Sequence, residues 1–220
     1  MTAGLPALIF DCDGVLVNSE PISNRVLCDG INDLGIRMSL DEVMHRYIGM
    51  TLDGVFVDIE KRLGRPLPEG WGAELDRVAD AAFEQDLQPI DGIIDALHVL
   101  RDHGYDMAMA SNGRRVRFDE SLRIVGLADW FSGLRFSGTE VAHPKPAPDL
   151  FLSAADAMGR RPSDCIVIED SLTGVRAGGQ AGMGVIHVAL GGPKAQAVGM
   201  SARTLHRMEQ LPVLIAAISG

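Results

Sequence analysis

The chain has 220 residues, of which 46% are hydrophobic and 23% charged, and its formal net charge at pH 7 is −10. This length and composition suffice for one globular domain with an insertion or for two small domains, and they argue against disorder. The negative charge, without a cluster of Lys and Arg, disfavours a nucleic-acid partner. A phosphorylated ligand would need a metal and a few placed cations to reverse this charge locally.

The cysteines and the two ends of the chain indicate the cellular compartment. Cys12, Cys28 and Cys165 are odd in number and far apart, which fits neither a disulfide framework nor a CxxC metal site. The first ten residues lack the basic start of a signal peptide, and the apolar stretch 211–218 is too short to span a bilayer. We therefore expect a soluble cytoplasmic protein with no membrane partner, either a monomer or a weak dimer.

In chain order, the hydrophobic pattern predicts three regions. A strand over 8–10 comes first, and residues from about 21 to 85 follow with mostly helical patterns. From residue 93 onward, helices alternate with short apolar strands: we expect helices at 96–102, 115–125, 148–158 and 172–181, and strands at 107–110, 134–136, 165–168 and 185–188. This order predicts an α/β fold, a Rossmann-like parallel sheet with helices on both faces, and a helical insert after the first strand. We place the core at residues 1–15 and 90–220 and the insert at 16–89.

Two acidic pairs follow predicted strands. Asp11 and Asp13 come directly after the first strand, and Glu169 and Asp170 follow the strand at 165–168. Active sites of open α/β sheets lie at the carboxyl ends of the strands, and carboxylates suit a divalent cation. A turn or a helix cap would also explain each pair taken alone.

A second set of polar groups suits a phosphate. Ser111, Asn112 and Gly113 follow the strand at 107–110 and precede a helix, so that side chains and turn N–H groups can bind an anion. Lys145 lies in a proline-rich loop, which limits where its side chain can point. Each feature alone has an ordinary explanation, a capped turn or a solvated lysine. Because four such polar groups follow successive predicted strands, however, we favour a shared functional site over four separate ordinary turns.

These residues resemble a known family. The pattern DxDxV at 11–15, the serine turn at Ser111, KPxPD at 145–149 and the acidic pair at 169–170 are similar to the four motifs of the haloacid dehalogenase superfamily. The resemblance covers essentially the whole chain, and the insert corresponds to the small helical cap of that superfamily. The phrases FDCDGVLVNSEP, SNG, FSG, KPAPDLF and IEDSLTGVRAG most resemble the group of sugar phosphatases and β-phosphoglucomutase relatives.

The resemblance implies a mechanism. Asp11 would attack phosphorus and form an aspartyl-phosphate, and Asp13 would act as general acid and then as general base. It also implies Mg²⁺ held by Asp11, the backbone carbonyl of Asp13 and Asp170, with Glu169 as a further ligand or an orienting group. Ser111, Asn112, Gly113 and Lys145 would bind the phosphoryl group.

Several alternatives stay open. Cys12 is disfavoured as a nucleophile because no arginine follows it within 13–20, and Ser111 lacks a histidine base marked by any motif. Asp13 and Asp170 speak against dehalogenase chemistry. A β-phosphoglucomutase-like phosphomutase is the main alternative, although Ser23 stands where those enzymes carry histidine, and 49–53 lacks their arginine. A non-catalytic phosphate-binding domain is the third.

The predicted function is therefore a Mg²⁺-dependent phosphatase acting on a small phosphorylated metabolite, a sugar or a sugar acid. Specificity is expected to reside in the cap, which closes over sites of this kind. The candidate substrate contacts there are Glu20, Asn24 and Thr51, together with Tyr47 and Arg46.

Overall fold

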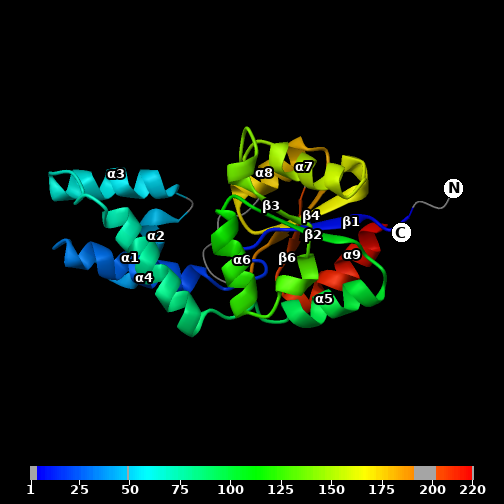
Figure 1. The fold of residues 1–220 in the computed structure, drawn as a ribbon, viewed down its shortest axis with the longest axis horizontal. Coiled ribbons are helices and arrows are strands. Elements are labelled where there is room, and N and C mark those ends of the chain that lie inside the picture. The colour runs from blue at the N-terminus through cyan, green and yellow to red at the C-terminus, as the bar shows by residue number, and fades with distance from the viewer. Residues whose placement is uncertain (1–3, 49, 191–201, 220) are drawn as a thin grey trace. The chain divides into compact units, whose positions relative to one another are not determined.

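The computed structural model describes residues 4–48, 50–190 and 202–219, and these form two compact units. Residues 19–87 make the smaller one, which we call the cap unit, and residues 1–18 with 88–220 make the core unit (Figure 1). Within the described residues, no helix has the length and apolar character needed to cross a membrane.

The core unit is an α/β structure, which confirms the predicted class. Its strands are β1 (Ala7–Phe10), β2 (Met107–Ser111), β3 (Arg135–Ser137), β4 (Cys165–Glu169), β5 (Gly184–Val188) and β6 (Ala202–Leu205). Its α-helices are α5 (Ile93–Asp102), α6 (Arg115–Ile124), α7 (Asp149–Ala157), α8 (Leu172–Gln180) and α9 (Leu211–Ser219). Short 3₁₀ helices lie at Ala128–Phe131, Gly138–Glu140, Pro162–Asp164 and Met208–Gln210.

The strands form one parallel sheet in the order β3-β2-β1-β4-β5-β6. The helices α7 and α8 cover one face, and α5 and α9 cover the other (Figure 1). Because both faces are covered, β1, β2 and β4 are buried along their whole length, and they are apolar apart from the last residues of β2 and β4, Ser111 and Glu169. The strand order reverses between β1 and β4, and open sheets of this kind bind ligands at such a reversal.

The strand β6 was not predicted from the sequence. Its four residues, Ala-Arg-Thr-Leu, show no clear alternation of apolar and polar side chains. They are a strand because β5 offers an edge, with which β6 pairs from Val185↔Ala202 to Val188↔Leu205. The helix α9, which was expected only as an apolar tail, ends the described chain.

The described residues of the cap unit form the helices α1 (Glu20–Asp33), α2 (Leu40–Tyr47), α3 (Leu52–Leu63) and α4 (Trp71–Asp86). They surround a separate apolar cluster that includes Ile31, Val43 and Ile59, all fully buried. Trp71 packs against this cluster and meets Phe56 edge to face, with ring centroids 5.4 Å apart. Trp71 is thus part of the cap core.

Local signals explain where two cap helices begin. The helix α2 starts with a capping box, in which the Ser39 hydroxyl accepts from the Glu42 N–H and the Glu42 carboxylate accepts from the Ser39 N–H. The helix α3 is capped by Thr51, whose hydroxyl accepts from the Gly54 N–H at 3.2 Å. Both helices carry acidic residues in the first turn and basic residues in the last.

Candidate active site

The first acidic residue, Asp11, lies at the point where the sheet reverses its order. Its backbone N–H donates to the Ile168 carbonyl of β4 at 2.9 Å, and its side chain is buried. The chain then turns sharply, because the Cys12 carbonyl accepts from Leu16 and Val17, and Gly14 adopts a φ of +76°. A φ of this sign favours glycine over residues with a Cβ. The turn leaves the Asp13 side chain exposed.

Lys145 reaches into the same place from the loop that follows β3. Its ammonium donates to Asp11 Oδ1 at 2.6 Å, to Glu169 Oε2 at 2.7 Å and to the Ala110 carbonyl at 2.9 Å. The Phe151 ring lies beneath it, with Nζ 4.8 Å from the ring centroid. All three N–H bonds of the ammonium therefore have acceptors, and Lys145 joins the carboxyl ends of β1, β2 and β4.

Glu169 is almost completely buried, and both of its oxygens are engaged. Oε2 accepts from Lys145, and Oε1 accepts from the backbone N–H groups of Asp170 and Ser171 and from the Ser171 hydroxyl. The carboxylate lies against α8, where a Cβ on Gly174 would be only 1.9 Å from Oε2. Glycine is thus required at this point of the helix. Of the two roles expected for Glu169, these contacts favour the orienting one.

Asn112 connects the turn after β2 to the lysine loop. Its amide Nδ2 donates to the Lys145 carbonyl at 3.0 Å, and its Oδ1 accepts from the Lys145 N–H at 2.9 Å. The side chain that was expected to bind phosphate therefore holds the lysine backbone. Ser111 is buried at the end of β2, and its hydroxyl accepts from the Gly113 N–H at 3.1 Å.

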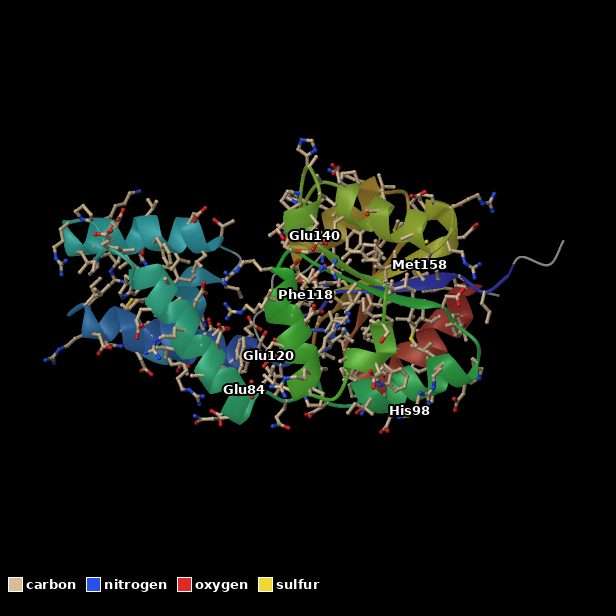
Figure 2. All side chains as sticks on the ribbon, in the orientation of Figure 1. Glu84, His98, Phe118, Glu120, Glu140 and Met158 are labelled. Carbon is tan, nitrogen blue, oxygen red and sulfur yellow. The ribbon has the colours of Figure 1, made fainter. Side chains whose placement is uncertain are left out.

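Positive charge gathers at the start of α6, directly after this turn. Arg114, Arg115 and Arg117 follow one another there, and the first turn of the helix has no acidic residue. Arg115 donates to both carboxylate oxygens of Glu140 at 2.6 Å, and Figure 2 shows Glu140 beside α6. Arg115 is therefore engaged by a carboxylate of the core unit, which offsets its charge.

The electrostatics of the buried groups follow from burial and from their neighbours. Burial raises the pKa of the Asp11 carboxyl well above its ordinary value, and Glu169 raises it further, whereas Lys145 opposes the change. Burial alone would lower the pKa of Lys145, but the carboxylates of Asp11 and Glu169 outweigh it and raise this pKa. Lys145 therefore stays positively charged.

The acidic residues also offer a place for a cation. Asp11, Glu169 and Asp170 each present one oxygen, and these oxygens lie within 4.8 Å of one another. An all-oxygen set of this kind suits a hard divalent cation.

A family model described as a haloacid dehalogenase-like hydrolase matches residues 5–182. The chain belongs to this family. The 6-phosphogluconate phosphatase of Escherichia coli (strain K12) is 29% identical over 211 residues, which cover 96% of this chain and 94% of that protein.

Solved structures agree with the family assignment. A haloacid dehalogenase-like protein of unknown function from Agrobacterium tumefaciens strain C58 superimposes with a TM-score of 0.86 and 31% identity, over 99% of this chain and 100% of that chain. A HAD family hydrolase from Deinococcus radiodurans R1, solved with bound phosphate and sodium, gives a TM-score of 0.82 and 30% identity, over 98% and 96% of the two chains.

In this haloacid dehalogenase-like hydrolase, most of the predicted cap contacts have structural partners. Thr51 caps α3, Arg46 forms a bidentate ion pair with Asp58, and the Tyr47 hydroxyl donates to the same carboxylate. Glu20 is exposed at the start of α1, and Asn24 is half-buried on the same helix.

Sequence reasoning missed three residues that support this site: Gly174, Phe151 and His187. The need for Gly174 and the contact of Phe151 with Lys145 depend on packing between separate segments. His187 had a visible signal, because it is the one polar residue in the apolar run Val185 to Val188.

Proposed function

We propose that this protein hydrolyses phosphate monoesters of small sugars or sugar acids, with Asp11 as the nucleophile. The observation that carries this proposal is the position of Asp11, buried where the sheet order reverses and held by the charged Lys145 at 2.6 Å. The family assignment agrees with hydrolysis.

In the first step, a carboxylate oxygen of Asp11 attacks phosphorus while the bond from phosphorus to the ester oxygen breaks. Asp13, which is exposed and two residues away, donates its proton to the leaving oxygen. The product is an aspartyl-phosphate on Asp11 and a free alcohol. Lys145 favours this step because its positive charge reduces the repulsion between Asp11 and an anionic phosphoryl group.

In the second step, a water molecule attacks the aspartyl-phosphate and Asp13 accepts the proton of that water. The bond from phosphorus to Asp11 breaks, inorganic phosphate leaves, and the carboxylate of Asp11 is restored. The Ser111 hydroxyl lies at the end of β2, where its proton is suited to a phosphoryl oxygen while its oxygen accepts from the Gly113 N–H.

The residues present fit a magnesium ion. Asp11, the backbone carbonyl of Asp13 and Asp170 would hold it, while Glu169 orients Lys145 and the turn at Asp170. When bound, Mg²⁺ would supply charge neutralisation on the phosphoryl oxygens. The closeness of the Asp11, Glu169 and Asp170 oxygens, within 4.8 Å of one another, supports this assignment.

The substrate class rests on relatives and on one difference from the mutases. The similar E. coli protein is a 6-phosphogluconate phosphatase, and the Deinococcus hydrolase was solved with phosphate. Ser23 in α1 offers no imidazole where β-phosphoglucomutases carry one, which favours transfer to water over transfer to a sugar hydroxyl.

The test is phosphate release by the purified protein from an aryl phosphate, with and without Mg²⁺, followed by a screen of phosphorylated metabolites that includes 6-phosphogluconate. We expect Mg²⁺-dependent release that Asp11→Asn abolishes, and kcat/KM values that favour a sugar or sugar-acid phosphate. Asp13→Asn should slow release strongly but preserve folding, as circular dichroism would show.

Three outcomes would overturn the proposal. Turnover of Asp11→Asn equal to that of the parent would exclude the assigned nucleophile, and no release from any ester would indicate a binding domain. Conversion of β-glucose-1-phosphate to the 6-phosphate with a bisphosphate primer, with little free phosphate, would establish the phosphomutase instead.

A further inference from the structure

We propose that His187 is a positioning residue that fixes the backbone of Asp170 and thereby the metal-binding carboxylate. The proposal rests on the metal site proposed above. His187 lies on β5 opposite Glu169 and is 1% exposed. Its Nε2 lies 3.2 Å from the Asp170 carbonyl oxygen.

This contact defines which nitrogen carries the proton. A carbonyl oxygen can only accept a hydrogen bond, so Nε2 must be the donor. The other ring nitrogen, Nδ1, is buried and has no hydrogen-bond partner among the described residues. Buried polar atoms without a partner are costly and rare. In His187, only one of the two ring nitrogens has a hydrogen-bond partner in the described part of the chain, although the ring is buried in an apolar strand. We infer that the hydrogen bond made by Nε2 has a function that offsets this cost.

The use follows from where the sheet ends. The parallel pairing of β4 with β5 stops at Glu169↔His187, so Asp170 is the first residue beyond the ladder. Its N–H donates to the Glu169 carboxylate and its carbonyl accepts from the His187 side chain. Two side chains thus replace the hydrogen bonds that a further pair of strand residues would have made. They fix the peptide groups on either side of the Asp170 Cα, and hence the direction in which its carboxylate leaves the chain.

The test compares Mg²⁺ binding by variants that keep or remove a donor at the Nε2 position. His187→Gln places an amide N–H close to that position, His187→Asn places one too near the backbone to reach, and His187→Met removes it. Val185→Ala is the matched control, since Val185 is buried on the same strand and the same face. Binding is measured by calorimetry and by the rise in melting temperature as Mg²⁺ is added, neither of which requires turnover.

We expect His187→Asn and His187→Met to weaken Mg²⁺ binding about tenfold or more, as loss of groups that orient metal ligands does elsewhere. His187→Gln should stay within about threefold of the parent, and Val185→Ala should lower the melting temperature without changing Mg²⁺ affinity. If His187→Met fails to fold, the Mg²⁺ affinities of His187→Gln and His187→Asn still test the inference.

The inference is wrong if His187→Asn binds Mg²⁺ as tightly as the parent. It is also wrong if His187→Gln weakens binding as much as His187→Asn does, or if Val185→Ala weakens it as much. Either of these two results would mean that His187 only fills space. If the parent protein itself binds no Mg²⁺, the proposed metal site fails and this inference fails with it. If the parent binds Mg²⁺ and the His187 variants bind it equally well, the metal site stands and only the role of His187 is overturned.

Discussion

At the scale of single residues, the most telling position is Cys12, a thiol between two catalytic candidates. Burial raises the pKa of this thiol well above its ordinary value, and the carboxylates of Asp13 and Asp11 raise it further. The thiolate is the reactive form of cysteine. Cys12 therefore stays protonated and inert, although it lies inside the motif, and it fills space beneath the turn.

We predict that Cys12→Ala keeps kcat within about threefold of the parent, because the side chain provides packing and no chemistry. Thiol labelling of the folded protein at pH 8 should leave Cys12 unmodified until denaturant is added. Mass spectrometry of the labelled peptides checks this. Rapid native labelling at Cys12, or complete loss of turnover in the alanine variant, would contradict the assignment.

At the scale of elements, α8 shows how one helix is shaped by a buried carboxylate. A glycine inside a helix is ordinarily less stable than alanine by about 0.5–1 kcal/mol. Gly174 and Gly179 both lie in α8, yet a Cβ at Gly174 would be 1.9 Å from Glu169 Oε2, whereas nothing lies within 4 Å of a Cβ at Gly179. The same substitution in the same helix should therefore have opposite effects.

We predict that Gly174→Ala lowers the free energy of unfolding and reduces kcat about 100-fold, because Glu169 must move and Lys145 loses one of its three acceptors. Gly179→Ala should raise the free energy of unfolding by up to about 1 kcal/mol and leave kcat unchanged. Urea denaturation and steady-state kinetics measure both. Equal stabilisation by the two substitutions would show that Glu169 is free to move.

Within the cap unit, Asp58 joins α3 to α2. Its carboxylate accepts two hydrogen bonds from Arg46 and one from the Tyr47 hydroxyl. The hydrogen bonding from Arg46 lowers the pKa of Asp58, burial opposes this, and the bond from Tyr47 lowers the pKa further. Because the pKa is lower in the folded state, the carboxylate stabilises the fold above its unfolded pKa of about 3.9, and this contribution disappears as pH falls through the folded value.

We predict that Asp58→Asn lowers the melting temperature at pH 7 and that the gap between variant and parent narrows as pH falls below about 4. The effect should be modest, since the Arg46 side chain is 46% exposed and solvent screens the pair. Thermal unfolding of the full chain between pH 3 and 7 measures the gap. A gap independent of pH would mean that Asp58 acts through packing alone.

At the scale of the whole molecule, the two units have separate apolar cores. The chain leaves and re-enters the core unit side by side, where Val17 pairs with Pro89 and the Asn18 N–H donates to the Gln88 carbonyl at 2.9 Å. The residues assigned to the chemistry all belong to the core unit. Substitutions in the cap unit should therefore change the choice of substrate and leave the reaction itself intact.

We predict that Asn24→Ala and Glu20→Gln raise KM for the best substrate of the metabolite screen and change kcat for a small aryl phosphate by less than about threefold. Ser23→Ala, a neighbouring substitution on the same helix, serves as the comparison. Steady-state kinetics with both substrates give the result. Equal losses on both substrates would place these residues in the chemical step or in the stability of the cap.

The sequence alone determined which residues stand at the strand ends. Apolar runs predicted β1, β2 and β4, and parallel strands bring their carboxyl ends to one edge, so Asp11, Ser111 and Asp170 could be grouped without coordinates. The class of the fold followed in the same way and is confirmed. Such predictions succeed because strand patterns and their flanking residues are local properties of the chain.

Only the tertiary structure decided what these residues touch. Lys145 finds its acceptors on Ala110, Asp11 and Glu169, which are 35, 134 and 24 residues away in the chain. The side-chain amide of Asn112, which was expected to bind phosphate, forms hydrogen bonds with the backbone of Lys145. The four residues of β6 become a strand only because β5 offers an edge. Each of these depends on contacts between distant segments, and a contact of that kind leaves no periodic or local signal in the sequence.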